Sequence, residues 1–236
     1  MRGLLTNLGG LTSNKVITVT AYQTITYTAN VCVLMNTTGQ SLAFMNPSLS
    51  ISTGTLTAST WYFVYVAWNP TTSTLIAFVD TNATTPSTLP SGYTYYALQG
   101  AVVTTTGTSG LICTKQMGRF AHYVVGGINC AGLPVVMTGA TGSYSTPTFT
   151  TYAMSGFVPS ITTAVKVTGH VQNGMLAVCP NAAYGAYNST TNPPYFYINN
   201  ANADGGMGLI PLETMNIYVY SQAGSVLAVA GWEDAL

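Results

Sequence analysis

The stretch from Trp61 to Trp68, Trp-Tyr-Phe-Val-Tyr-Val-Ala-Trp, places the strongest constraint on how this chain folds. In an extended strand, successive side chains point to opposite faces. Trp61, Phe63 and Tyr65 would therefore share one face, and Trp68 would lie on the other. Both faces are then apolar or aromatic. A strand of this kind belongs to the middle of a packed β structure or to a contact between subunits. We therefore expect these four residues to take part in a subunit interface as well as in the core.

The rest of the chain repeats the β pattern. Short runs of β-branched and aromatic residues alternate with turn clusters, and no window combines good helix formers with a 3.6-residue apolar period. This alternation is typical of an all-β sandwich or barrel. We predict an antiparallel, jelly-roll-like β-sandwich made of two β domains in tandem. The domains would comprise residues 15–120 and 121–236, after an N-terminal arm at residues 1–14.

Turn residues between the runs predict several antiparallel hairpins. Asn69-Pro70-Thr71-Thr72 suits a type I turn, because proline fixes φ at the second position, and it predicts that Trp61–Trp68 pairs with Thr74–Val79. Asn173-Gly174 tolerates the positive φ of a type I′ turn. With the turns at 107–110 and 222–224, it predicts three more hairpins, which pair 93–105 with 111–117, 164–171 with 175–180, and 215–220 with 225–232.

Charged residues are rare, at 4% of the chain against about 25% in a typical globular domain. Five acids balance five scattered cations, which are Arg2, Lys15, Lys115, Arg119 and Lys166. Nucleic-acid binding needs clustered cations, so no nucleic-acid partner is expected. No apolar run approaches the roughly 18 residues of a membrane-spanning helix, so no membrane insertion is expected. A net charge of zero favours association, which suits a protein that works within an assembly. The alternative is a monomer that its Thr, Ser and Asn side chains keep in solution.

The four cysteines, Cys32, Cys113, Cys130 and Cys179, lie far apart in apolar, β-like surroundings and form no C-x-x-C motif. Cysteines in such surroundings are usually small buried hydrophobes, and the paired spacing of a zinc site is missing. The alternative that the sequence leaves open is a disulfide bond between Cys113 and Cys130. Asp204 lies in a cluster of turn residues, and a calcium ligand is the alternative reading of it. We expect no metal site and no cofactor.

Groups that could carry out catalysis are few. Glycoside hydrolysis needs two carboxylates across a cleft. The chain offers only Asp80, Asp204, Glu213, Glu233 and Asp234. Glu233 and Asp234 are adjacent, so in a strand they would face opposite ways. His122 and His170 have no nucleophile motif beside them. We expect a non-enzymatic protein without catalytic residues.

Several short motifs are spread over the chain from about residue 17 onward. The two most specific are Thr57-Ala58-Ser59-Thr60-Trp61-Tyr62 and Leu89-Pro90-Ser91-Gly92-Tyr93-Thr94-Tyr95-Tyr96. Weaker ones are Gly100-Ala101, Gln116-Met117-Gly118-Arg119, Phe157-Val158-Pro159 and Gly231-Trp232-Glu233-Asp234. Together they resemble motifs of tailed-bacteriophage tail-fibre and virion surface-fibre proteins.

This resemblance implies a non-enzymatic β-sandwich protein of the virion, assembled in the host cytoplasm. A tail fibre or tail-associated part is the expected role, and a capsid decoration or neck fibre protein is the alternative. We expect a homo-oligomer, with a trimer as its form, that also contacts other virion proteins. The resemblance carries over no site residues. Tyr95-Tyr96 stands where a basic pair often follows Gly-Tyr in such proteins, so a contact based on charge is not expected.

A second role is host-receptor binding through glycan. Sugar contacts commonly combine aromatic faces with amides and hydroxyls, and loops on rigid β scaffolds often carry binding. The loop at 181–194 and the short strand after it supply such residues. The candidate contacts are Tyr184, Tyr187, Asn188, Asn192, Tyr195 and Tyr197. The alternative is that these tyrosines are packing and interface residues.

Overall fold

The chain is built from antiparallel β-sheets. The computed structural model describes residues 12–107, 109–143, 146–172, 174–200 and 206–236, and no helix occurs within these ranges. The all-β, antiparallel prediction is therefore confirmed, and the many β-branched and aromatic runs are its physical basis. The jelly-roll connectivity and the tandem domains with a boundary after residue 120 stay predictions.

Two compact units make up the chain. The first ends at Gly132 and also takes in Asp234–Leu236, and the second is Leu133–Glu233. The strands of the first unit are β1 (Val16–Ala21), β2 (Thr24–Thr28), β3 (Val31–Asn36), β4 (Ser41–Met45), β5 (Ser48–Ser52), β6 (Trp61–Asn69), β7 (Thr74–Asp80), β8 (Tyr95–Val103), β9 (Thr114–Met117) and β10 (Phe120–Tyr123). Those that follow are β11 (Val135–Thr138), β12 (Thr150–Ala153), β13 (Thr162–His170), β14 (Gly174–Cys179), β15 (Phe196–Asn200), β16 (Gly206–Pro211), β17 (Asn216–Ser221) and β18 (Val226–Asp234).

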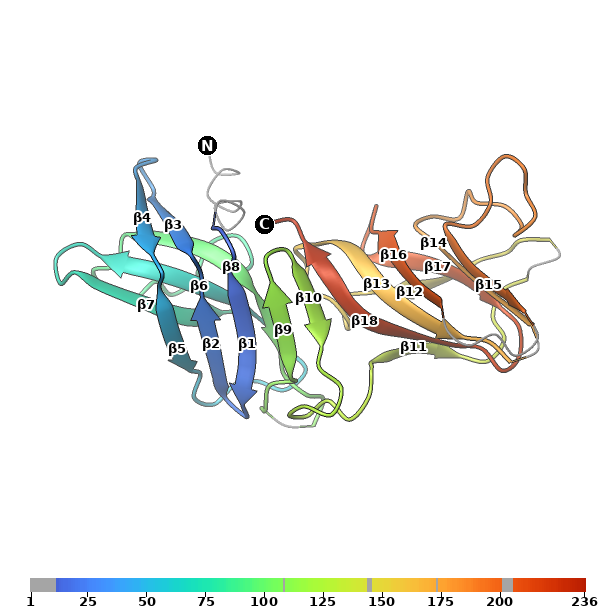
Figure 1. Ribbon diagram of the computed structural model, residues 1–236, viewed down its shortest axis with the longest axis horizontal. Coiled ribbons are helices and arrows are strands. Elements are labelled where there is room, and N and C mark those ends of the chain that lie inside the picture. Colours follow the sequence, from blue (N-terminus) through green and yellow to red (C-terminus); the bar gives the residue numbers. More distant parts are fainter. Residues whose placement is uncertain (1–11, 108, 144–145, 173, 201–205) are drawn as a thin grey trace. The chain divides into compact units, whose positions relative to one another are not determined.

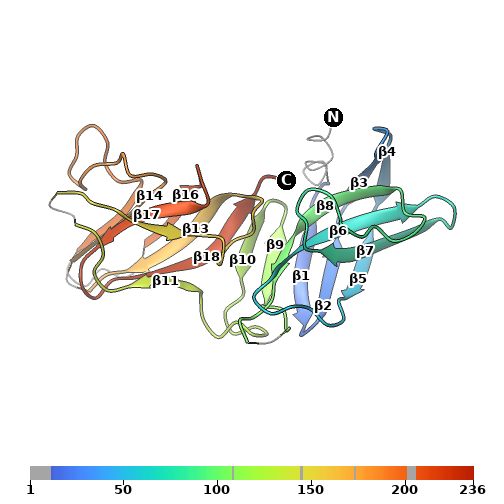
Figure 2. The ribbon, with the colours of Figure 1, turned by 180° about the vertical axis from the view of Figure 1, so that it is seen from behind.

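The first unit is a sandwich of two layers. One layer has the order β4-β3-β8-β6-β7, and the other contains β10, β9, β1, β2 and β5 in that order. Figure 1 shows β1, β2 and β5 in front of β6 and β7, and Figure 2 shows the same layers from behind. Buried residues of both layers form one hydrophobic core, among them Ile17, Ile25, Leu34, Val64 and Val102. The two-layer arrangement follows because each layer buries an apolar face against the other.

Strand β6 lies between β7 and β8, so both of its edges are paired within the sheet. The predicted hairpin of β6 and β7 is confirmed. Phe63 and Tyr65 are only 4% and 1% exposed within a single chain. They are therefore core residues, which corrects the expectation that they contact another subunit. Trp61 and Trp68 are half-buried and keep some surface for such a contact.

The second unit also has two layers. One sheet has the order β12-β17-β14-β15, and the other places β16, β13 and β18 side by side, with β11 paired to β18. In β14, Leu176 faces β13, since a side chain added at Gly169 would lie 2.5 Å from Leu176 Cδ2. The neighbouring residues Met175 and Ala177 point to the opposite, outer face of the sheet. They are buried as well, so something covers that outer face.

Three of the predicted hairpins are wrong. Strands β13 and β14 belong to different sheets, and so do β17 and β18. The segment after Gly110 makes only one bridge to the end of β8, between Thr104 and Leu111, and β9 pairs with β1 and β10 instead. In each of these three cases the predicted turn connects strands of different layers. A short turn that contains glycine can connect two strands of one sheet or lead the chain from one layer to the other.

Contacts between two of these crossing turns explain their glycines. Gln172 N–H donates to Gly224 O at 3.3 Å, and Gln222 N–H donates to Met175 O at 2.9 Å. Gly224 has φ +76°, and a side chain there would meet Gln172 O at 2.8 Å. Glycine is thus needed at this position for a positive φ and for the close approach of two turns.

Candidate functional site

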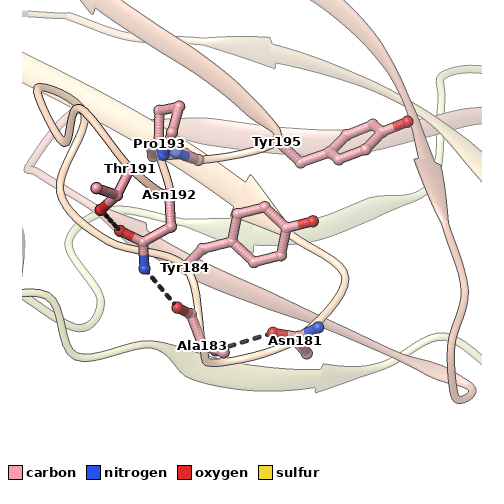
Figure 3. Close-up of a pocket in the computed structure, with 8 residues that line it drawn as sticks. Asn181, Ala183, Tyr184, Thr191, Asn192, Pro193 and Tyr195 are labelled. Atoms are coloured by element: carbon pink, nitrogen blue, oxygen red, sulfur yellow. Dashed lines mark hydrogen bonds between the residues drawn. The ribbon is translucent and has the colours of Figure 1, made fainter.

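The loop between β14 and β15 surrounds an open cavity of about 560 Å³. Its lining residues are Asn181, Ala183, Tyr184, Thr191, Asn192, Pro193, Pro194 and Tyr195. Figure 3 shows the phenol rings of Tyr184 and Tyr195 pointing the same way from the loop backbone. Tyr195 is 51% exposed and Tyr184 is half-buried. The cavity therefore offers aromatic surface to solvent.

Asn192 holds the loop closed upon itself. Its Nδ2 donates to Ala183 O at 2.8 Å, and Gly185 N–H donates to Asn192 O at 2.7 Å. Ser189 Oγ donates to Asn192 Oδ1 at 2.7 Å. These bonds join the two ends of the loop, so the aromatic rings are carried on a fixed backbone.

Asn181 ties the start of the loop to the turn before β17. Its Nδ2 donates to both carboxylate oxygens of Glu213, at 3.0 and 2.8 Å, and its Oδ1 accepts from Ala183 N–H at 2.9 Å. Glu213 is thereby held beside the cavity. Burial raises the pKa of Tyr184, and the nearby Cys179, Glu213 and Tyr195 raise it further. The Tyr184 hydroxyl therefore stays protonated and can donate a hydrogen bond at neutral pH.

The outer face of the sheet anchors the loop. Tyr187 packs with Phe149 against Met175, Ala177 and Tyr220. The centroids of the Phe149 and Tyr220 rings lie 5.1 Å apart. This cluster buries the outer side of β14 and fixes the loop on the sheet.

The structure brings together only part of the predicted glycan contacts. Tyr184, Asn192 and Tyr195 line the cavity. Tyr187 packs on the sheet, which is the packing role that the sequence had left open for the tyrosines. Asn188 is exposed elsewhere in the loop, and Tyr197 is 49% exposed on β15; neither lines the cavity.

Sequence reasoning missed several residues of this site. Asn181, Thr191 and Pro193 belong to the same predicted loop, so their proximity was available from the sequence alone. Glu213 was not within reach of such reasoning, because it follows Asn181 by 32 residues and no local motif links the two.

A second hollow, of about 690 Å³, lies in the first unit. It is lined by Thr105, Gly107, Gly126, Gly127, Asn129, Cys130 and Ala131. None of these residues has an aromatic ring, so the hollow lacks a stacking surface for a ligand. The loop cavity of the second unit is therefore the stronger candidate.

All four cysteines are buried as free thiols, as expected of small hydrophobic residues. Within the described ranges, no three His, Cys, Asp or Glu side chains gather as a metal site would require. Asp204 lies outside the described residues, so the calcium alternative is untested. No helix among the described residues is long and apolar enough to span a membrane.

Comparisons with protein-family models, with curated proteins and with solved structures found no match to this chain. The proposed function therefore rests on the cavity and its residues.

Proposed function

We propose that this chain is a non-enzymatic component of a bacteriophage tail fibre, and that it binds host-surface glycan through the loop at 181–195. The short motifs that resemble tail-fibre proteins support the setting. The antiparallel β units support it as well, since rigid β scaffolds suit proteins that present loops to a partner.

One observation carries the binding role. Tyr184 and Tyr195 expose their rings at one open cavity, on a loop that hydrogen bonds and a packed tyrosine hold in place. Aromatic rings offer apolar faces to the C–H side of a sugar ring, and their hydroxyls offer hydrogen bonds to its edge. A site that is already shaped before binding avoids part of the entropic cost of ordering a loop.

The test is binding to host cells and to their purified surface glycans. We expect the double variant Tyr184→Ala/Tyr195→Ala to weaken binding by at least about tenfold, which corresponds to about 1.4 kcal/mol. Met207→Ala is the matched control, because Met207 is 61% exposed in the same unit and does not line the cavity. Equal binding by the double variant and the control would refute the glycan site.

We further propose that the chain works as a homo-oligomer, a trimer, in contact with other virion proteins. Its low charge supports this, since little electrostatic repulsion opposes association. Electron microscopy of intact virions with a labelled antibody would locate the chain. Label on the tail is expected, and label confined to the capsid or neck would contradict the tail-fibre role.

A further inference from the structure

We propose that the loop cavity selects uncharged sugar residues and discriminates against those that carry a carboxylate, such as uronic and sialic acids. This inference rests on the proposed function and adds the class of glycan. It follows from the fixed charges around the cavity.

Glu213 is fixed beside the cavity. Both of its carboxylate oxygens accept hydrogen bonds from Asn181 Nδ2, at 3.0 and 2.8 Å, and Asn181 itself lines the cavity. Glu213 does not itself line the cavity, and its negative charge is held directly behind Asn181, which does. The negative charge of Glu213 is close enough to Tyr184 to help raise the pKa of its phenol, after burial and Cys179.

The second unit has a single Lys or Arg side chain that could compensate this charge. Lys166 is the only Lys or Arg of the sequence between Leu133 and Glu233. It lies on β13, where it is exposed between the fully buried Val165 and Val167, so its side chain points away from the interior.

The cavity loop is on the other side of the sandwich. Tyr187 packs on Met175 and Ala177, whereas Leu176 faces β13. The loop therefore covers the outer face of one sheet, and Lys166 lies on the outer face of the other. Packed sheets are about 10 Å apart, and charges are screened over about 8 Å at physiological ionic strength. Lys166 cannot offset a carboxylate in the cavity.

The hydrogen-bonding groups of the cavity suit a ligand rich in hydroxyls. The side-chain amides of Asn181 and Asn192 already donate to Glu213 and to Ala183 O. The hydroxyls of Tyr184 and Tyr195, at the cavity, can donate or accept, and the side-chain oxygens of the two asparagines can accept. Sugar hydroxyls can donate to these acceptors, whereas a sugar carboxylate can only accept. The cavity thus matches a neutral, hydroxyl-rich ring.

The test uses pairs of glycans that differ only in charge. Uronic-acid-containing bacterial polysaccharides are compared with the same polysaccharides after chemical reduction of their carboxyl groups to alcohols. Both forms are printed on one array with neutral bacterial glycans, and affinities are measured by calorimetry. We expect the reduced forms to bind about five- to tenfold more tightly than the acids, which is the scale of one like-charge contact at about 4 Å in an open, water-filled site.

Glu213→Gln is the diagnostic variant, because glutamine keeps an acceptor for Asn181 and removes the charge. We expect it to raise the affinity for acidic glycans about fivefold and to leave neutral glycans within about twofold. Thermal denaturation checks that the variant is folded. Acidic glycans that bind as well as their reduced forms would overturn this inference and leave the glycan site intact. The inference also fails if Glu213→Gln shifts both classes alike. An array on which no glycan binds would overturn the proposed function itself, and the inference with it.

Discussion

Lys15, just before β1, is a charged side chain in the core of the first unit. It is 1% exposed, and its Nζ has no hydrogen-bond partner among the described residues. Burial lowers its pKa from an ordinary value of 10.5 to about 8, although the charge of Asp234 acts in the opposite direction. The ionised form is thus less stable in the folded chain than in water.

The consequence for stability depends on pH. The folded chain releases this proton near pH 8, whereas the unfolded chain keeps it until about pH 10.5. Between these values the unfolded state binds more protons, so the free energy of unfolding rises with pH. Below about pH 8 both states are protonated, and the cost of burying the charge is fully present.

We therefore predict that wild type gains stability relative to Lys15→Met as the pH rises from about 8 to about 10.5, by up to about 3 kcal/mol, at roughly 1.4 kcal/mol per pKa unit. Other titrating groups act equally on both proteins over this range. The difference at pH 7 also contains the loss of a positive charge beside the buried Asp234, so the change with pH is the diagnostic quantity. Urea denaturation of both proteins across this pH range is the measurement. A difference independent of pH would show that the buried charge is not its cause.

Gly224 determines how two of the turns that cross between the layers pack against each other. Gly224→Ala would place a methyl group 2.8 Å from Gln172 O at a positive φ. We expect a loss of about 1–2 kcal/mol in the free energy of unfolding. Gly156→Ala is the control, since no atom lies within 4 Å of its added methyl group and its φ is not positive. Equal effects of the two substitutions, measured by urea denaturation, would contradict this account of the crossing.

The loop at 181–195 separates into packing and binding residues. Tyr187→Ala removes a ring that packs on Met175, Ala177 and Tyr220, and we expect it to destabilise the second unit by about 1–3 kcal/mol. Tyr187→Phe keeps the ring and should cost much less. Thermal denaturation of the two variants tests this. If Tyr187→Ala reduced glycan binding and left the stability unchanged, Tyr187 would be a glycan contact and not a packing residue.

Strand existence was predictable from the sequence, but the pairing of strands was predictable only in part. The turn at Asn69-Pro70 led to the right hairpin because β6 and β7 are neighbours in one sheet. The turn at Gly224 did not, since β17 and β18 lie in different layers. Local residues determine that the chain turns, whereas the burial of faces against the other layer determines where the next strand goes.

The candidate site shows the same division. Tyr184, Asn192 and Tyr195 were found because aromatic and amide residues crowd one loop. Tyr187 shares that composition and yet packs inward, because the outer face of β14 is apolar and needs a cover. Only the fold distinguishes the two kinds of tyrosine, and only the fold brings Glu213 to Asn181.

At the scale of the whole molecule, association should depend on apolar contact and not on charge. The chain has 4% charged residues and no net charge. Exposed apolar side chains remain on the first unit, including Met45, Met117 and Phe120 at 71%, 49% and 55% exposure. Burial of such surface is favourable in water and is not screened by salt.

We therefore predict a trimer whose mass, measured by light scattering after gel filtration, is three times that of the chain. It should persist when the salt concentration is raised from about 50 to about 500 mM, because a change in Debye length over this range weakens only charge contacts. Excluded salts such as sulfate should strengthen it. A monomer at micromolar concentration would refute self-association. A trimer that dissociates with added salt would show that the few charged residues, and not the apolar surface, hold it together.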